Sequence, residues 1–215
     1  MKPGLIVDIK KIAEMTEIVE TADGGFRIGA AVSGATLAEH KGFGKAWPGV
    51  LEAINLIGSK QVQGPNGRRS MPVEAVPAGP GRTTLKPGEI VVSFTLPPRP
   101  AGSSDAYLRM IPRTEMDIAV VGVGVSLTMQ GGVVTAARVG LGAVAPTVLL
   151  VEAAAKALIG SRLDDAALEA AAAACSAACN PINDKRGTIV YRTKVAGVLL
   201  KRTVAIAAAR AQGGN

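Results

Sequence analysis

The sequence predicts an α+β fold with a turn-rich first half and a second half of strands followed by helices. In the first hundred residues, short apolar segments alternate with turns rich in Gly, Pro and Asn. In the second half, three strand candidates precede three helical stretches, a pattern typical of a sheet covered by helices. A hydrophobic content of 48% in 215 residues suffices for one large core or two small ones. We therefore expect α+β rather than a doubly wound nucleotide fold.

The expected elements of the first half have local signals. Residues 23–25, Asp-Gly-Gly, form a turn sequence between two apolar segments, Ser33 is a suitable N-cap, and Pro48 is suited to the start of a helix. The Val, Phe and Thr content of residues 89–96 favours a strand. The expected strands are Leu5–Ile9, Glu17–Glu20, Phe26–Ala30, Arg68–Val73 and Glu89–Leu96, and the expected helices are Gly34–His40 and Val50–Leu56.

A linker separates the two halves. Residues 97–104, PPRPAGSS, are rich in Pro and Gly, which oppose the continuation of a strand or helix, so we expect one domain over residues 1–98 and another over residues 103–215. In the second domain we expect a three-stranded antiparallel sheet, with Gly131 and Gly132 at a tight hairpin that requires positive φ angles. The expected strands are Tyr107–Ile111, Ala119–Met129 and Val133–Leu141. The expected helices are Leu149–Ile159, a segment that starts after Asp164-Asp165 and ends at Asn180-Pro181, and Ile189–Ala211.

The positive charge of the chain gathers near its C-terminus. The net charge is +7, and residues 182–215 contain seven basic residues against the single acid Asp184. These seven residues are Lys185, Arg186, Arg192, Lys194, Lys201, Arg202 and Arg210. On a helix they would spread around the cylinder, and Tyr191 is the single aromatic residue among them, too few for base stacking. We therefore expect solvated helix faces or a subunit interface, and no nucleic-acid site.

Metal binding and membrane spanning are not expected. Cys175 and Cys179 lie four residues apart on one helix face, but a zinc or iron–sulfur site normally needs four ligands, and His40 is the only histidine. The two cysteines are expected to be small buried side chains. No apolar run reaches the ~18 residues of a membrane span, and no signal segment opens the sequence, so we expect a cytoplasmic protein.

Two distant segments carry a family resemblance. Residues 107–119, YLRMIPRTEMDIA, and residues 183–203, NDKRGTIVYRTKVAGVLLKRT, together resemble the end domain of the flavin-carrying medium subunit of molybdenum hydroxylases. This family includes xanthine dehydrogenase and aerobic carbon monoxide dehydrogenase. Further segments resemble the same subunit in the same order, namely PGLIVDIKKIAEM (3–15), FRIGAAVSGATLAEH (26–40), IGSKQVQ (57–63), RTTLKPGEIVVSFTLP (82–97) and RVGLGAVAPT (138–147).

The resemblance implies an electron-transfer function. In the family, a large molybdopterin subunit hydroxylates the substrate, a small subunit carries two [2Fe–2S] clusters, and the medium subunit's FAD passes electrons to the acceptor. This chain would then be the FAD-binding medium subunit of such a complex, an oxidoreductase component with the other two subunits as partners. No acid, base or nucleophile set is visible in the sequence, which agrees with a subunit that binds and tunes a cofactor.

The resemblance also implies candidate cofactor contacts. Arg109 matches the position at which a basic side chain lies against the flavin ring, where a cation favours reduced flavin. Arg113 and Asp117 belong to the same motif and could either contact the cofactor or form a local ion pair or turn cap. Val91 matches an apolar position that packs against the flavin, although a strand valine is also a core candidate. Thr83 and Thr84 precede Val91 in a loop that is expected to line the same cleft.

Two family features are missing. The family holds the pyrophosphate of FAD with a GGTD-type loop near its N-terminus and a TIGGN-type loop after the QVR segment, and neither is present here. At residues 60–64 the chain runs from KQVQ directly into GPNGRR. Either the protein is a shortened paralogue or the sequence has lost segments. The alternative function is therefore a flavin-less assembly or scaffold subunit of such a complex.

Overall fold

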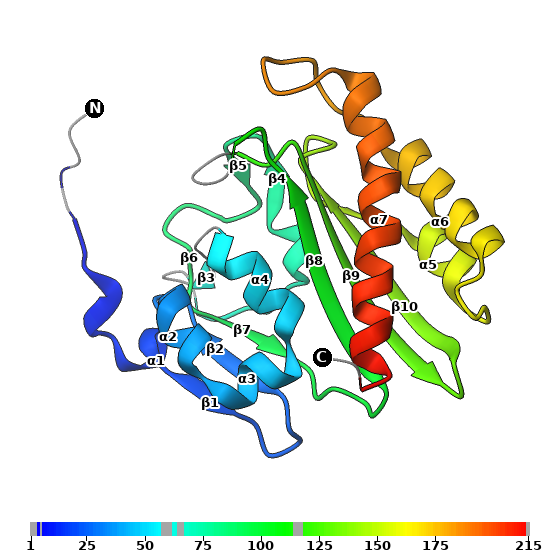
Figure 1. Cartoon of the computed structure of the whole chain (residues 1–215). Coiled ribbons are helices and arrows are strands. Elements are labelled where there is room, and N and C mark those ends of the chain that lie inside the picture. Colours follow the sequence, from blue (N-terminus) through cyan, green and yellow to red (C-terminus); the bar gives the residue numbers. More distant parts are fainter. Residues whose placement is uncertain (1–3, 5, 57–61, 64–66, 114–117, 214–215) are drawn as a thin grey trace.

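A computed structural model of the chain describes residues 4, 6–56, 62–63, 67–113 and 118–213. The small strands and short helices of the first half lie beside a second part, in which long strands carry three helices along one side (Figure 1). This arrangement of helices with antiparallel sheets confirms the α+β class.

Short elements build the first half of the chain. Strand β2 (Phe26–Gly29) lies between β1 (Ile18–Glu20) and β7 (Ser93–Leu96) in an antiparallel sheet. Phe26 and Ile28 are buried against helices α2 (Gly34–Glu39) and α3 (Lys41–Ala46). Ser33 caps α2 as expected, because its Oγ accepts the N–H of Thr36 at 3.0 Å. The other elements are η1 (Ile9–Lys11), α1 (Ala13–Thr16), α4 (Pro48–Leu56), β3 (Val62–Gln63), η2 (Val73–Ala75), β4 (Pro77–Gly79), β5 (Arg82–Thr83) and β6 (Ile90–Val91).

A four-stranded antiparallel sheet forms the second part, in the order β11-β10-β9-β8. Its strands are β8 (Ser103–Met110), β9 (Val121–Gln130), β10 (Val133–Gly142) and β11 (Leu149–Leu150). Gly131 and Gly132, with φ angles of 57° and 79°, close the hairpin between β9 and β10 as expected. Helices α5 (Glu152–Leu158), α6 (Asp165–Ala178) and α7 (Ile189–Ala211) follow, and α7 has the predicted bounds.

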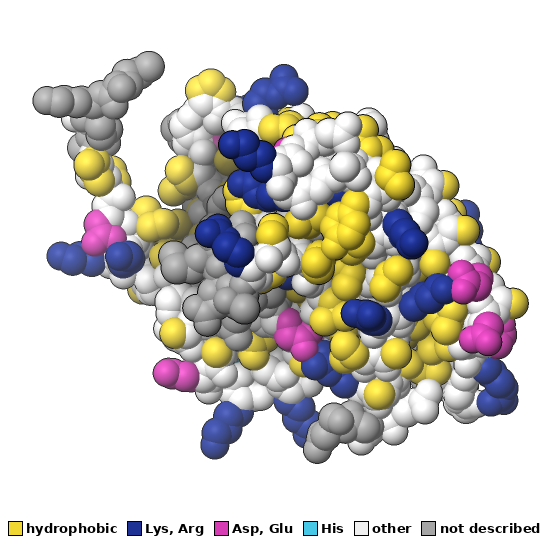
Figure 2. All heavy atoms as spheres, turned by 45° about the horizontal axis from the view of Figure 1, so that its top comes forward, with side chains coloured by type: hydrophobic (Ala, Val, Ile, Leu, Met, Phe, Trp, Pro, Cys, Tyr) yellow, Lys and Arg dark blue, Asp and Glu magenta, His cyan; other side chains and the backbone are white. Residues whose placement is uncertain are grey.

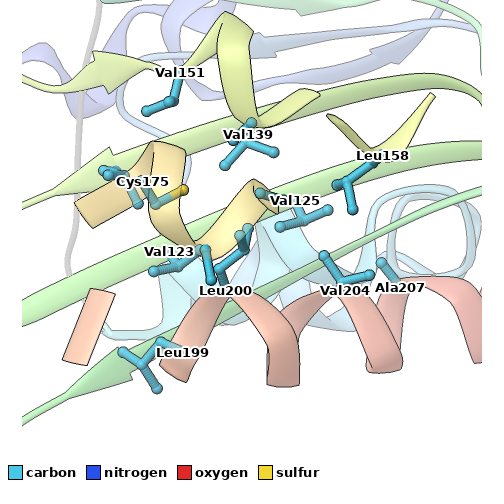
Figure 3. Close-up of a cluster of buried hydrophobic side chains, with 14 of the residues drawn as sticks. Val123, Val125, Val139, Val151, Leu158, Cys175, Leu199, Leu200, Val204 and Ala207 are labelled. Carbon is cyan, nitrogen blue, oxygen red and sulfur yellow. The ribbon is translucent and has the colours of Figure 1, made fainter. Parts of the chain in front are cut away.

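The larger core lies between this sheet and the three helices. In Figure 3, Val123 and Val125 of β9 and Val139 of β10 face side chains of all three helices. Every second residue of β9 from Val121 to Leu127 is buried, because side chains alternate across a strand and only one face meets the helices. Cys175 of α6 is one of the buried side chains, as expected, whereas Cys179, directly after α6, is only half-buried.

Four expectations for the elements were wrong. Instead of a strand at Leu5–Ile9, residues 6–8 are irregular and a 3₁₀ turn begins at Ile9, with Asp8 accepting the N–H of Lys10 at 3.0 Å. The expected strand Arg68–Val73 is irregular up to Pro72, and the expected strand Glu89–Leu96 divides into β6 and β7.

The remaining correction concerns the sheet of the second part, which has four strands rather than three. Leu149 and Leu150, expected as the start of a helix, pair with Leu141 and Gly140 as the additional strand β11, so α5 starts only at Glu152.

Candidate functional site

The sheet of the second part has a second face, which is polar and turned away from the helices. Ser103, Asp105, Tyr107 and Arg109 of β8 alternate with the core-packed residues of the same strand, so they share this face. Asp105 Oδ2 accepts the N–H of Val50 at the start of α4, at 2.9 Å. The polar face is therefore turned toward the first half of the chain.

Four glycines form a strip on the polar face, which we call the glycine strip (Gly122, Gly124, Gly140 and Gly142). They pair in register across β9 and β10, and Arg109 is the register partner of Gly122 on β8. The strip thus offers a surface without side chains beside a guanidinium group.

The ring of Tyr107 covers the β9 side of the glycine strip. A methyl group on Gly122 would lie 2.5 Å from Tyr107 Oη, so only glycine fits beneath the ring. A methyl group on Gly142, the partner of Gly122 on β10, would meet no atom within 4 Å, so the β10 side of the strip is open there. Burial raises the pKa of Tyr107, and the neighbouring Arg109 opposes this shift. The phenol is therefore neutral at ordinary pH.

A cleft of about 1150 Å³ lies between the first half and the polar face. Gly124 and Gly140 belong to its lining, so the cleft is continuous with the glycine strip. Its volume exceeds the roughly 300–1,000 Å³ of most small-molecule sites, which leaves room for a dinucleotide. The charged residues that line it are Arg68, Arg69, Arg99, Arg138, Glu74 and Asp105, an excess of positive charge.

The predicted site residues are not all brought together. Arg109 lies on the polar face, whereas Arg113 is exposed beyond the end of β8, and Asp117 lies outside the described residues. Val91 is half-buried in β6, where it pairs with Val62 of β3.

Thr83 and Thr84 are exposed, at the end of β5 and directly after it. Thr84 Oγ1 donates to the carbonyl of Ala75 at 2.8 Å, a local contact that holds the hairpin of β4 and β5. The lining of the cleft contains none of the predicted site residues that the structure describes, namely Arg109, Arg113, Val91, Thr83 and Thr84. Between β6 and β7 it contains Val92 rather than Val91.

Sequence reasoning missed a buried ion pair between the two halves of the chain. The side chains of Arg99 and Asp105 are only 10% and 8% exposed, and Arg99 Nη2 lies 2.8 Å from Asp105 Oδ1. The guanidinium carbon of Arg99 lies 3.8 Å from the centre of the Trp47 ring, a cation–π arrangement. Burial raises the pKa of Asp105 and lowers that of Arg99, because both charged forms lose hydration. No sequence signal separates this pair from ordinary linker and strand charges.

Arg192 was expected on a solvated helix face or at a subunit interface, and it is instead inside the protein. It is 4% exposed and pairs with Asp184, with Arg192 Nη2 2.7 Å from Asp184 Oδ1. Arg210 is also engaged internally, because its Nη1 donates to the carbonyl of Asp105 at 3.0 Å. On the face shown in Figure 2, Lys and Arg side chains are spread among apolar and neutral ones.

The remaining candidates have structural roles. His40 caps α3, because its Nδ1 accepts the N–H of Phe43 at 3.1 Å. Burial raises the pKa of the Cys175 thiol to about 12, so this thiol is unreactive.

In the described part of the chain, no three His, Cys, Asp or Glu side chains are grouped so that they could hold a metal ion. Likewise, none of the described helices combines the length and apolar content that crossing a bilayer requires.

Comparison with known proteins identifies the family. The profile of the CO dehydrogenase flavoprotein C-terminal domain matches residues 106–207, and that of the FAD binding domain in molybdopterin dehydrogenase matches residues 1–64. The chain belongs to the FAD-binding medium subunits of molybdenum hydroxylases. Its relatives are components of oxidoreductases with several subunits.

Individual relatives support this family assignment. The carbon monoxide dehydrogenase medium chain of Afipia carboxidovorans is 37% identical over 169 residues, which are 79% of this chain and 58% of that protein. The solved carbon monoxide dehydrogenase from Hydrogenophaga pseudoflava superimposes with a TM-score of 0.88 at 31% identity, covering 94% of this chain and 81% of that one. The structure of Cu,Mo-CO dehydrogenase gives a TM-score of 0.87 at 30% identity over the same shares.

The chain is shorter than these medium subunits. It spans 58% and 52% of the two carbon monoxide dehydrogenase medium chains that it matches. The putative xanthine dehydrogenase FAD-binding subunit XdhB of Escherichia coli K12 is 26% identical, over 97% of this chain and 82% of that protein. That alignment has 243 positions against the 215 residues of the whole chain, so at least 28 positions of the relative have no counterpart here. The matched part of this relative therefore contains internal positions that this chain lacks.

Proposed function

We propose that the chain is the FAD-binding medium subunit of a molybdenum hydroxylase and passes electrons from a partner's [2Fe–2S] clusters to an acceptor. The observation that carries this proposal is the glycine strip beside Arg109 on the polar face, at the end of a cleft with room for a dinucleotide. The match of residues 1–64 to an FAD-binding family supports it. When bound, FAD supplies the capacity to accept and release electrons.

The residues present fit the ring end of such a cofactor. The open β10 side of the glycine strip, at Gly142, gives a planar ring a flat contact surface, because no side chain projects there. Arg109 shares this face and would place a positive charge beside the ring, favouring its reduced, anionic form. Arg113 and Val91 are further candidate contacts, on the ground of the family resemblance alone. The same ground applies to Asp117, Thr83 and Thr84.

The division of the chain into two domains belongs to the same proposal. We assign residues 1–98 to an incomplete FAD-binding domain and residues 103–215 to the C-terminal domain of the medium subunit. Two observations support this division. The family matches cover residues 1–64 and 106–207, and the buried residues of the smaller and larger cores fall on either side of residues 97–104.

The partners would be a small [2Fe–2S] subunit and a large molybdopterin subunit. A flavin subunit without an acid–base site of its own needs an external source of electrons, which these subunits would supply. Val190 and Val198 of α7 are 76% and 42% exposed, so this helix offers apolar surface for a partner to cover. The two free cysteines, Cys175 and Cys179, agree with an assignment to the reducing cytoplasm.

A flavin-less assembly subunit is the second candidate function. The missing internal positions favour it, because the family's TIGGN-type phosphate loop would follow Gln63 and the sequence there reads GPNGRR. A charged group loses about 1.5–3 kcal/mol for each hydrogen bond that is not made. Without a substitute for the loop, the pyrophosphate would be bound weakly.

Titration of the purified protein with FAD distinguishes the two functions. We expect saturable quenching of flavin fluorescence at one FAD per chain, with weaker binding of riboflavin, which lacks the phosphates. A colourless protein that leaves flavin fluorescence unchanged at all accessible concentrations would favour the assembly function.

Replacement of Arg109 tests the ring site itself. In Arg109→Ala, the midpoint potential of bound flavin should fall by about 30 mV for each 1.4 kcal/mol of lost stabilisation of the reduced form. Arg202→Ala, at an exposed position of α7, is the matched control and should leave the potential unchanged. Equal potentials in the parent and Arg109→Ala would remove Arg109 from the site.

A further inference from the structure

Arg192 is a buried arginine for which the proposed electron transfer gives no role. It lies in the first turn of α7 and is 4% exposed. Its Nη1 donates to the carbonyl of Val120 at 2.7 Å and to that of Ala143 at 3.3 Å. A single guanidinium group thus binds two residues that are 23 positions apart in the sequence, one just before β9 and the other just after β10.

A fixed carboxylate balances the charge of Arg192. Asp184 Oδ1 accepts from Arg192 Nη2 at 2.7 Å and from the backbone N–H groups of Arg186 and Gly187 at 2.8 and 3.2 Å. These hydrogen bonds lower the pKa of Asp184 to about 2. The carboxylate therefore stays ionised at neutral pH, and its position is set by the α6–α7 loop rather than by side-chain rotation.

The two carbonyls that Arg192 binds lie at the Arg109 end of the glycine strip. Val120 directly precedes β9, two residues before Gly122, and its N–H donates to the carbonyl of Met110 at 2.8 Å. Ala143 directly follows Gly142 and has a φ of +64°, an unfavourable conformation for a residue with a Cβ. The contact from Arg192 helps to hold this strained turn.

We propose that Arg192 is a positioning residue for the proposed cofactor site. It ties the start of β9 to the end of β10, and through the Val120–Met110 hydrogen bond it also ties them to the end of β8, where Arg109 lies. It thereby fixes the distance between Arg109 and the open β10 side of the glycine strip at Gly142. This inference rests on the proposed function, because the strip is taken as the surface for the cofactor ring.

Lysine cannot replace Arg192 in this role. The planar guanidinium presents several donors in fixed directions and reaches Val120, Ala143 and Asp184 at once. A lysine ammonium is a compact point charge on a flexible stem. Arg192→Lys therefore keeps the positive charge beside Asp184 but loses the simultaneous hydrogen bonds to the two carbonyls. This variant distinguishes the positioning effect of Arg192 from the effect of its charge.

The test compares Arg192→Lys and Arg192→Met with the parent and with Arg202→Met, an exposed position on the same helix. In the cofactor-free proteins, both Arg192 variants should show at least about ten-fold faster amide exchange in peptides covering residues 118–124 and 141–146, with unchanged exchange in the middle of α7. In the FAD-loaded proteins, the dissociation constant of FAD should rise about ten-fold or more, and the midpoint potential should shift. Arg202→Met should match the parent in every measurement.

Three results would overturn the proposal. Exchange at residues 118–124 equal to that of the parent would show that Arg192 does not hold the strand ends. Exchange that accelerates evenly over the whole sheet would show a general effect on stability. Faster local exchange with unchanged FAD affinity and potential would confine Arg192 to a structural role. Titration of the parent protein with FAD tests the proposed function separately. If the parent binds no FAD, the proposed function has failed, and the role of Arg192 toward the flavin ring fails with it.

Discussion

Asp105→Asn should strongly destabilise the protein, because it removes the anion that balances a buried arginine. The side chains of Asp105 and Arg99 are 8% and 10% exposed, and no carboxylate other than Asp105 pairs with Arg99 among the described residues. Arg99 Nε and Nη1 are also buried without a hydrogen-bond acceptor. Asparagine keeps the shape and can still accept the N–H of Val50, so the substitution removes mainly the charge.

The size of the effect follows from the burial of the pair. Breaking a buried ion pair typically costs about 3–5 kcal/mol, because the remaining charge stays desolvated and uncompensated. Removing both charges in Arg99→Met/Asp105→Asn should cost clearly less than the sum of the single variants, because the pair itself contributes little net stability. Arg99→Met leaves the Asp105 carboxyl buried without its cation, which raises its pKa further.

Urea unfolding of the four proteins, followed by circular dichroism, measures this double-mutant cycle. When a carboxyl has a raised pKa in the folded state, the protein loses folding stability as pH rises through that pKa, because the group must then ionise where it is buried. The deficit of Arg99→Met relative to the parent should therefore be larger at about pH 8 than at about pH 5. Additive single effects, or an Asp105→Asn loss below about 1 kcal/mol, would refute the reasoning.

Three further predictions concern the second part of the chain. Leu200→Ala opens a cavity at a fully buried position and should cost about 2–5 kcal/mol in urea unfolding, whereas Val198→Ala, 42% exposed, should cost less than about 1 kcal/mol. Asp164 is the N-cap of α6, and its carboxylate accepts the N–H of Ala167 at 3.0 Å. Asp164→Ala should therefore lower the free energy of unfolding by about 1 kcal/mol, and Asp165→Ala, which removes no capping bond, should lower it by less. The Cys175 thiol, with its pKa raised to about 12, should not react with an aromatic disulfide reagent at pH 8 until the protein is unfolded, and rapid native reaction of this thiol would contradict its burial.

Much of the fold could be predicted from local sequence signals. The Gly131-Gly132 hairpin and the bounds of α7 follow from turn chemistry and helix periodicity, which depend on neighbouring residues only. The segment at Arg68–Val73 was predicted wrongly, and its two arginines make contacts with distant acids that no local signal reveals. Arg68 pairs with Glu14, and Arg69 pairs with Glu89 at 2.7 Å.

The candidate site was predictable only in part, because its geometry depends on register and long-range contacts. Arg109 could be placed by the family resemblance, but its alignment with the glycine strip required the pairing of β8, β9 and β10. Arg192 reaches a carbonyl 72 residues away, and a charged residue in a basic helix gives no local sign that it is buried. The Arg99 and Asp105 pair escaped prediction for the same reason.

The flavin content of the assembled complex tests the central claim most directly. The chain would be co-expressed with a small [2Fe–2S] subunit and a large molybdopterin subunit as candidate partners, and the complex purified by size-exclusion chromatography. We predict one FAD per copy of the chain and bleaching of the flavin absorption when the iron–sulfur clusters are reduced, because electrons then pass to the flavin. A stable complex that contains this chain but no flavin would contradict the account and support the assembly function.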